Sequence, residues 1–183
     1  MVSQEMEIQV RSAAEEDVQA ILEIINFEIA NTTTVYDYTE RTTEAQLAWF
    51  KNKKEESMPV IVAELNGAVV GYGTYGIFRP WDGYLHSIEH SMYVSNGSRG
   101  RGIGKLILSE LIRLARAEGY HTMIAGLDAA NRGSYEFHKK CGFVEIGVLR
   151  EIGYKFDRWL NLIFMQLIFD TNSQDTPDKC NLP

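Results

Sequence analysis

The chain has 183 residues, 45% of them hydrophobic, and its formal net charge at pH 7 is −7. This length and apolar content suffice for one domain with a sizeable core. The negative charge argues against a general nucleic-acid surface, which needs an excess of Lys and Arg on some face. No apolar run approaches the length of a membrane span, and residues 1–7 lack the regions of a signal peptide. We therefore predict a cytoplasmic protein that binds neither nucleic acid nor a membrane.

The two cysteines, Cys141 and Cys180, are far apart in the sequence and match no metal-ligand spacing. Cys180 lies in a polar segment, which favours a reducing compartment over a structural disulfide. We therefore expect no metal site and no structural disulfide.

Periodicity and turn residues predict helices and antiparallel strands in the first half of the chain. Apolar residues recur at helical spacing after residue 17, and Asn66-Gly67 is a strong hairpin signal between two β-rich runs. In chain order, the expected elements are a strand at Ile8–Arg11, a helix that begins within 13–17 and reaches Ile29, a helix at Thr43–Lys54, and strands at Val60–Leu65, Val69–Ile77 and Tyr84–Val94.

The second half mixes helices and strands in the same way. Its expected elements are a helix at Leu106–Ala117, a strand at Met123–Leu127, a helix from Asn131 to Cys141, and strands at Phe143–Glu151 and Trp159–Phe169 joined by a loop through Gly153 and Asp157. The last strand is apolar on both parities, which predicts burial on both faces. The pattern indicates an α/β (α+β) layer fold. We expect a single domain over residues 1–170 and a polar, flexible tail over 171–183.

The segment Arg99-Gly100-Arg101-Gly102-Ile103-Gly104 lies between a strand-like and a helix-like run. Glycines at such a junction let backbone N–H groups converge, and the helix start adds partial positive charge. A P-loop would need Ser or Thr where Leu106 stands, and a dinucleotide fingerprint would need Gly where Lys105 stands. Taken alone, the segment is equally well explained as a tight turn. What remains, Arg-x-x-Gly-x-Gly, resembles the pyrophosphate loop of the GCN5-related N-acetyltransferases (GNAT), which hold acetyl-CoA.

Asn131 lies between an expected strand and an expected helix, where it can cap the helix. In the resembling family the pattern Asn-x-x-Ser continues through a proton donor to Gly-Phe, and here it reads Asn131, Ser134, His138 and Gly142-Phe143. Many members have Tyr at the place of His138. A histidine there can protonate a thiolate or relay a proton from the amine. Without the motif, His138 is more readily explained as an ordinary helix residue.

Alternation in the strand 86–94 places Glu89 and Ser91 on one face and Ile88 and Met92 on the other. An ammonium group must lose a proton before its nitrogen can attack a thioester, and a carboxylate in a cleft can accept that proton. Glu89 is therefore the candidate base, although a lone Glu is more often a solvent-facing strand residue. His90 has the parity of the core, which favours a core histidine over a substrate contact released by a bulge.

The segment Phe78-Arg79-Pro80-Trp81-Asp82 joins two expected strands. An arginine beside an aromatic residue at the mouth of a cleft suits a carboxylate or phosphinate, because the guanidinium binds such groups bidentately. Taken alone, the segment is more readily explained as a solvated turn.

Together the motifs closely resemble the phosphinothricin and methionine sulfoximine N-acetyltransferases, in order from Ile8 to Phe169. The motifs that carry the resemblance are Arg79-Pro80-Trp81, residues 88–94, residues 99–104, Asn131 with His138, Gly142-Phe143, and residues 153–159. The sequence departs from the common pattern at Asp157, where Gly is frequent, and at Asn161, where Asp is frequent. These departures concern the shape of one loop and not the chemistry.

The resemblance implies a GNAT fold, with a mixed, mostly antiparallel sheet of six to seven strands, helices on both faces and a splay between the central strands. It implies Glu89 as base and His138 as acid or relay. The implied substrate contacts are Arg79, Pro80, Trp81, Glu89, His90 and Ser91. The implied acetyl-CoA contacts are Met92, Tyr93, Val94, Arg99, Gly100, Arg101, Gly102, Ile103, Gly104, Lys105 and Asn131. It also implies a homodimer, with the segments around 31–33 and 155–159 near the cleft.

We therefore expect an enzyme that transfers acetyl from acetyl-CoA directly to the α-amine of a small amino-acid analogue, such as methionine sulfoximine, methionine sulfone or phosphinothricin. Two alternatives remain open. A polyamine or protein N-terminal acetyltransferase is one, although a polyamine site would have extra carboxylates where this chain has Arg79 and Trp81. A catalytically silent acyl-CoA sensor is the other, and it would bind acetyl-CoA without turnover.

Overall fold

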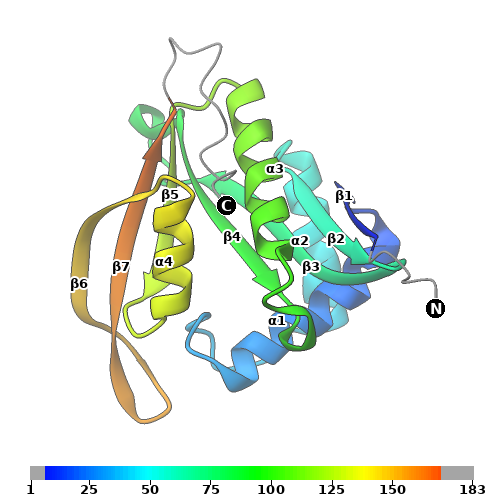
Figure 1. Cartoon of the computed structure of the whole chain (residues 1–183), viewed down its shortest axis with the longest axis horizontal. Helices are drawn as coiled ribbons and strands as arrows, with labels where there is room; N and C mark the ends of the chain where they lie inside the picture. Colours follow the sequence, from blue (N-terminus) through cyan, green and yellow to red (C-terminus); the bar gives the residue numbers. More distant parts are fainter. Residues whose placement is uncertain (1–6, 170–183) are drawn as a thin grey trace, which may run out of the picture.

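The computed structural model describes residues 7–169, which form one seven-stranded sheet covered by helices (Figure 1). The strands are β1 (Ile8–Ser12), β2 (Val60–Leu65), β3 (Ala68–Ile77), β4 (Ser87–Val94), β5 (Thr122–Asp128), β6 (Val144–Lys155) and β7 (Arg158–Ile168). The α-helices of this part are α1 (Val18–Asn31), α2 (Thr43–Glu55), α3 (Ile103–Ala117) and α4 (Arg132–Lys140), and single 3-10 turns lie at Glu15–Asp17, Asp82–Tyr84 and Asn96–Ser98. The expected α/β fold with a mixed sheet is confirmed.

The strand order is β1-β2-β3-β4-β5-β7-β6, and β4–β5 is the parallel pair among otherwise antiparallel neighbours. This parallel ladder is short: it joins Ser87 to Thr122, Ile88 to Met123 and Glu89 to Ile124. Beyond Glu89 the two strands diverge, although β4 continues to Val94 and β5 to Asp128. The expected splay between the central strands therefore begins at Glu89.

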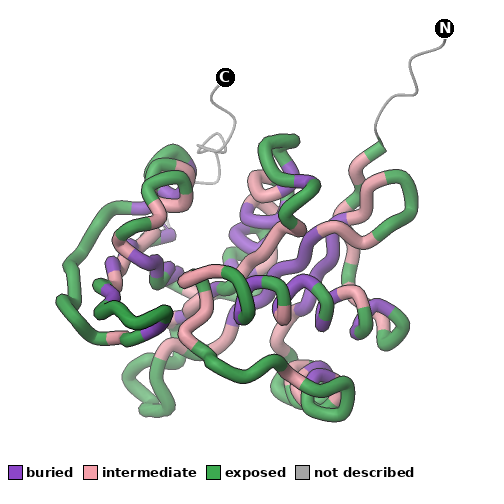
Figure 2. The backbone as a smooth tube through the Cα atoms, turned by 90° about the horizontal axis from the view of Figure 1, so that it is seen from below, coloured by how far each residue is buried: buried purple, intermediate pink, exposed green. Residues whose placement is uncertain are grey.

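Two apolar cores lie on opposite faces of the sheet. The larger one packs α3, through residues such as Ile107 and Leu111, against the central strands, and the smaller one packs α1 and Phe50 of α2 against Val62 and Tyr72. Figure 2 shows the buried residues concentrated in the middle of the sheet, whereas β6, at the sheet edge, is exposed along most of its length. Helices on both faces are what the family resemblance implied.

Several predicted boundaries were wrong. β4 begins at Ser87 and not at Tyr84, because 82–84 form a 3-10 turn. β6 continues through Gly153 to Lys155, so its connection to β7 is a two-residue turn at Phe156-Asp157 and not a long loop. The ring of Tyr36 packs where a side chain at Gly153 would lie, 2.5 Å from an ideal Cβ, which explains a glycine inside a strand.

The predicted burial of the last strand on both faces is confirmed in the middle of the strand and wrong at its ends. Leu160 on one face and Ile163 and Met165 on the other are buried, whereas Trp159 and Ile168 are 62% and 54% exposed. The strand lies one place from the edge of the sheet. The predicted helix from Leu106 begins earlier, at Ile103, inside the glycine loop. The predicted tail at 171–183 lies outside the described residues.

Within residues 7–169, no helix is long and apolar enough to span a membrane. Cys141 is buried in the larger core beside Phe143, which agrees with a packing role for this cysteine.

The close contact of α3 with β3 gives a stability prediction. A Cβ at Gly73 would lie 2.5 Å from Cγ2 of Ile107 and 2.9 Å from Cδ1 of Leu111, so Gly73→Ala overpacks the core. We expect a loss of about 1–3 kcal/mol in the free energy of unfolding, measured by urea denaturation. Gly83→Ala is the matched control, because a Cβ at Gly83 meets nothing within 4 Å. Equal stability of the two variants would contradict this packing.

Candidate active site

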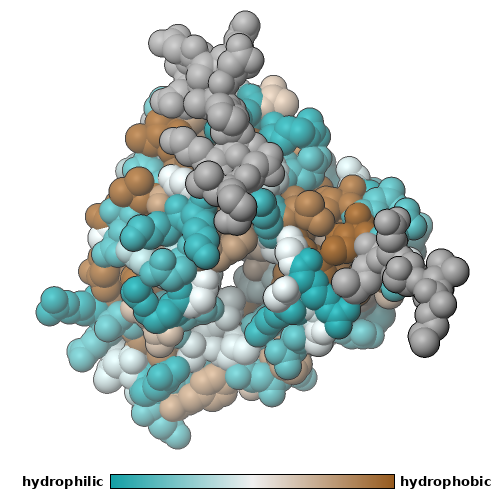
Figure 3. All heavy atoms as spheres, viewed as in Figure 1, coloured by the Kyte–Doolittle hydropathy of each residue, from teal (hydrophilic) through white to brown (hydrophobic). Residues whose placement is uncertain are grey.

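A groove of about 650 Å³ runs between the end of β4, the glycine loop and the start of α4. Figure 3 shows the surface hollowed between the α4 side and the α3 side of the molecule. The predicted acetyl-CoA contacts that line the groove are Met92, Tyr93, Val94, Arg99, Gly100, Gly102, Ile103, Gly104, Lys105 and Asn131. Arg101 is not among the lining residues. The structure thus brings almost the whole predicted set to one surface.

The glycine loop has the backbone geometry of an anion cradle. Gly100 and Gly102 have φ values of +77° and +81°, which side-chain-bearing residues rarely adopt. Gly102 is the N-cap of α3, so the helix starts at Ile103, and Ile103 and Gly104 of its first turn line the groove. The first N–H groups of a helix have no partner within the helix. The helix dipole adds partial positive charge at the same place. A diphosphate is the kind of anion that such a site binds.

Arg99 has a second partner that the sequence did not indicate. Its guanidinium is ion-paired with Glu28 of α1, and its Nε donates to the Val94 carbonyl at 3.1 Å. The Glu28 side chain is 2% exposed and also accepts a hydrogen bond from the Thr32 hydroxyl. Arg99 therefore ties the loop to α1. The available signal for Glu28 was an acid on the apolar stripe between Ile25 and Ile29, which only a charged partner could satisfy.

Asn131 caps α4 as expected. Its side-chain oxygen accepts the Ser134 N–H at 3.0 Å, and the residue lines the groove. The cap fixes the start of α4 beside the glycine loop. Ser134, Gly133 and Phe137, which sequence reasoning did not single out as groove residues, complete that wall.

Glu89 lies at the point where β4 and β5 part. Its Oε1 is 3.1 Å from the position that a Cβ at Gly126 of β5 would occupy, so the carboxylate depends on a glycine across the splay. Burial raises the pKa of Glu89, and the nearby positive charge of Arg79 partly opposes this rise. A half-buried carboxylate with a raised pKa is suited to accept a proton near neutral pH.

Glu89 and Ser91 face a small hollow of about 120 Å³ on the α1–α2 side of β4. Two cations that the sequence analysis missed, Arg41 and Lys53, also line it. Lys53 donates to the Tyr75 carbonyl at 2.8 Å, and its Nζ occupies the space beside Gly76, the cross-strand neighbour of Glu89. Burial lowers the pKa of Lys53. Tyr93 lines both this hollow and the groove, so the two spaces meet at β4.

Arg79, Pro80 and Trp81 lie on the exposed segment between β3 and β4. The Arg79 guanidinium lies 4.8 Å from the centre of the Phe78 ring, and Trp81 is 64% exposed. The positive charge of Arg79 lowers the pKa of Glu89, so Arg79 lies on the same side of the site as Glu89. None of the three lines the two spaces described above.

His90 and His138 lie together on the other side of β4. Both are buried, with 7% and 3% of their surface exposed, and their rings stack at a centroid distance of 5.2 Å. They line a further hollow of about 120 Å³, which shares Met92, Tyr93 and Ser134 with the groove. His90 points away from the face that carries Glu89, so the structure does not bring these two predicted substrate contacts together.

The connection between α1 and α2, residues 32–42, contacts the ends of β5 and β6, and we call it the roof of the site. Lys155, which is buried, donates to the carbonyls of Ile29 and Val35 at 2.7 and 2.6 Å. The hydroxyl of Thr33 donates to Asp128 at the end of β5. The roof therefore joins α1 to the β6–β7 hairpin, close to the segments that the resemblance placed near the cleft.

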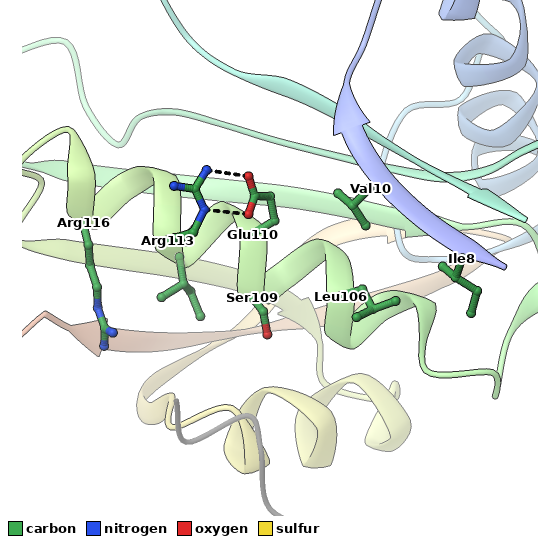
Figure 4. Close-up of a pocket in the computed structure, with 8 residues that line it drawn as sticks. Ile8, Val10, Leu106, Ser109, Glu110, Arg113 and Arg116 are labelled. Atoms are coloured by element: carbon green, nitrogen blue, oxygen red, sulfur yellow. Dashed lines mark hydrogen bonds and ion pairs between the residues drawn. The ribbon is translucent and has the colours of Figure 1, made fainter. Parts of the chain in front are cut away.

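A separate hollow of about 500 Å³ lies between β1 and α3 (Figure 4). It is lined by Ile8, Val10 and Leu106 and by an ion pair in which Arg113 holds Glu110 at 2.7 Å. None of the predicted site residues lines it. The described residues also hold no cluster of three or more His, Cys, Asp or Glu side chains arranged for a metal ion.

Comparison with known proteins agrees with this geometry. The model of the Acetyltransferase (GNAT) family matches residues 22–143. The chain belongs to the GNAT family. An L-methionine sulfoximine/L-methionine sulfone acetyltransferase of Salmonella typhimurium is 38% identical over 93% of this chain and 99% of its own length.

Two solved structures superpose closely on this chain. One is a phosphinothricin acetyltransferase from Sinorhizobium meliloti in complex with acetyl-CoA, 32% identical, with a TM-score of 0.87 and 94% of each chain covered. The other, titled a ribosomal-protein-alanine N-acetyltransferase from Brucella melitensis, is 44% identical, with a TM-score of 0.87 and coverage of 88% of this chain and 99% of that one.

The Arg99–Glu28 pair gives a prediction about the ligand-free protein. Arg99→Met leaves the buried Glu28 carboxylate without its cation, so we expect the free energy of unfolding to fall by about 1–3 kcal/mol in urea denaturation. The double variant Glu28→Gln with Arg99→Met should recover most of that loss. Lys105→Met is the control and should leave the stability unchanged. An Arg99→Met variant as stable as the parent chain would show that the pair does not hold the loop.

Proposed function

We propose that this GNAT protein transfers the acetyl group of acetyl-CoA to the α-amine of a small amino-acid analogue such as methionine sulfoximine, methionine sulfone or phosphinothricin. One observation carries the proposal. The groove that ends at the glycine loop and the hollow that Glu89 lines meet at β4, where β4 and β5 part. The similarity to methionine sulfoximine and phosphinothricin acetyltransferases supports this substrate class.

In the proposed reaction, acetyl-CoA lies in the groove with its diphosphate at residues 99–105 and its pantetheine arm beside Asn131. Because the β4–β5 ladder ends at Glu89, backbone N–H groups of β4 beyond that residue can reach the thioester carbonyl. Glu89 takes the first proton from the substrate ammonium. The neutral amine then attacks the thioester directly, with no enzyme-bound acetyl intermediate.

The charges around Glu89 support an amino-acid-like substrate. Arg41 and Lys53 line the hollow with Glu89, and Arg79 is near enough to act on its charge. A polyamine would be repelled by these cations, whereas a substrate with an amine and an anionic or oxygen-bearing group is attracted. Arg79, with Pro80, Trp81 and Ser91, remains the predicted contact for the oxygens of the substrate side chain.

One alternative keeps specific support. The Brucella melitensis structure named for a ribosomal-protein alanine is 44% identical to this chain, so acetylation of a protein N-terminus is a second candidate. The small volume of the Glu89 hollow, about 120 Å³, favours a free amino acid over a peptide.

We also propose that two chains associate through β6 and that residues 1–170 form one catalytic domain. The edge strand β6 exposes a row of apolar side chains, including Val144 and Ile146, at 66% and 54%. An exposed apolar edge strand favours pairing with another chain. Cytoplasmic location stays a prediction from the sequence.

Thiol release from acetyl-CoA tests the proposed function. The amines to compare are methionine sulfoximine, methionine sulfone, phosphinothricin, spermidine and a peptide with N-terminal alanine. We expect turnover with at least one of the three amino-acid analogues, rising with pH as Glu89 loses its proton above the ordinary carboxylate range. Glu89→Gln should lower kcat/KM by about 100-fold or more and keep acetyl-CoA binding. Turnover with the peptide alone would favour acetylation of protein N-termini. No turnover with any amine would contradict the proposed function and favour an acyl-CoA sensor.

Light scattering after size exclusion tests the association. The 20.8 kDa chain should elute with about twice that mass. Ile146→Lys should give a monomer, because it places a charge in the apolar row. Phe27→Lys is the control, since Phe27 is an exposed apolar residue of α1 and does not belong to the row on β6. A monomeric parent chain, or an unchanged mass in Ile146→Lys, would reject this interface.

A further inference from the structure

The two buried histidines form a pair whose hydrogen bonds have a fixed order. His138 Nδ1 lies 2.7 Å from the Ser134 carbonyl oxygen, and His138 Nε2 lies 3.2 Å from His90 Nε2. A carbonyl oxygen can only accept, so His138 carries its proton on Nδ1. Its bare Nε2 then accepts from the Nε2–H of His90. This order leaves His90 Nδ1 as the one unprotonated ring nitrogen of the pair without a hydrogen-bond partner among the described residues.

His90 Nδ1 is buried and has no hydrogen-bond partner among the residues that the structure describes. An unpaired polar atom in such a site is costly unless the protein uses it. Both rings are packed against Phe143, with centroid distances of 5.6 and 5.3 Å, so neither histidine is free to turn toward solvent. The pair lines the hollow that adjoins the groove through Met92, Tyr93 and Ser134.

We propose that His90 and His138 act as one proton carrier for the departing thiolate of CoA, and that the proton enters and leaves through His90 Nδ1. This inference rests on the proposed acetyl transfer. It changes the role suggested by the sequence motif, in which His138 alone is the acid. Here both nitrogens of His138 are already engaged, and His138 acts through His90.

The proton balance of the reaction fits such a carrier. The substrate ammonium gives its first proton to Glu89, which returns it to water. When the N–C bond has formed, the nitrogen still holds a surplus proton, and cleavage of the C–S bond leaves a thiolate. Nitrogen and sulfur are bonded to the same carbon in the tetrahedral intermediate, so one unpartnered imidazole nitrogen can serve both. His90 Nδ1 takes the proton from nitrogen and gives it to sulfur, and the pair ends the cycle neutral.

The surroundings keep the resting pair neutral, so the pair can accept a proton from nitrogen before it donates one to sulfur. Burial lowers the pKa of both histidines. A positive charge on one ring would also make protonation of the other ring less favourable. On β3, the neighbour of His90 is Tyr75, whose hydroxyl donates to Glu118 at 2.7 Å. On α4, the Ser134 carbonyl favours the protonated ring of His138. Among the described groups, no carboxylate is paired with either imidazole.

Kinetics of three variants and their combination test the carrier. His90→Phe and His138→Phe should each lower kcat with methionine sulfone about 100-fold, with little change in the KM for acetyl-CoA. The double variant should lose no more than either single variant, because the two rings act as a unit. His90→Gln should be as impaired as His90→Phe, since an amide can keep the hydrogen bond to His138 but cannot carry the proton. Full activity of His90→Gln, or additive losses in the double variant, would overturn the proposal.

Nitrogen NMR of ¹⁵N-histidine-labelled protein tests the pair without any substrate. The chain has four histidines, and the exposed His86 and His121 are internal references. At pH 8 we expect His138 with its proton on Nδ1 and His90 with its proton on Nε2, and joint titration of the two rings below the ordinary histidine range, because burial lowers the pKa of both. The opposite tautomer of His138, or independent titration, would overturn the pairing. His121→Gln should change neither the pair nor kcat.

The kinetic and NMR experiments distinguish this inference from the proposed function. Turnover by the parent chain together with active His90 and His138 variants would reject the carrier and keep the acetyltransferase. Absence of turnover with every amine would reject both, because no thiolate would then be formed for the pair to protonate. Thermal unfolding of each variant, compared with the parent chain, identifies a loss of activity that comes from misfolding.

Discussion

Three parallel residue pairs between β4 and β5 determine where chemistry can occur in this protein. The ladder closes the centre of the sheet up to Glu89 and then stops, so the strands part with side chains and backbone groups exposed along both. Parallel strands have evenly slanted hydrogen bonds, and an unpaired stretch leaves donors without partners. The groove, the Glu89 hollow and the histidine pair all lie around this opening. The first turns of α3 and α4 line the groove.

Charge is distributed around the opening in a way that suits an anionic cofactor and a cationic reacting group. The groove side uses backbone N–H groups and a helix start, which provide positive potential without long side chains. Arg99, the nearest guanidinium of the motif, is neutralised by Glu28 and holds the loop to α1. On the other side, Glu89 is a half-buried carboxylate near cations, so its proton affinity is a balance of burial and opposite charge.

The roof over the site links segments that are far apart in the chain. Lys155 spans from the β6–β7 hairpin to α1 and to the α1–α2 connection with two short hydrogen bonds to carbonyls. A buried ammonium needs such partners, because desolvation is costly. The same hairpin carries the exposed apolar edge of β6, so the Lys155 contacts and the proposed association of two chains involve one structural unit.

The sequence by itself determined the elements and the loop. Helical and strand periodicity, the Asn66-Gly67 turn and the glycines at 100 and 102 depend on local backbone preferences, which are readable from neighbouring residues. The glycine loop also indicated an anionic ligand, and its residues except Arg101 line one groove.

Tertiary structure alone decided the partners. Glu28 and Arg99 are 71 positions apart, and His90 and His138 are 48 apart. No local pattern joins them, because the register of β4 and the docking of α1 and α4 set those distances. Parity assigned His90 to the core, and only packing against α4 made it the partner of His138. The same holds for Arg41 and Lys53, which reach the Glu89 hollow because α1 and α2 cover that face of the sheet.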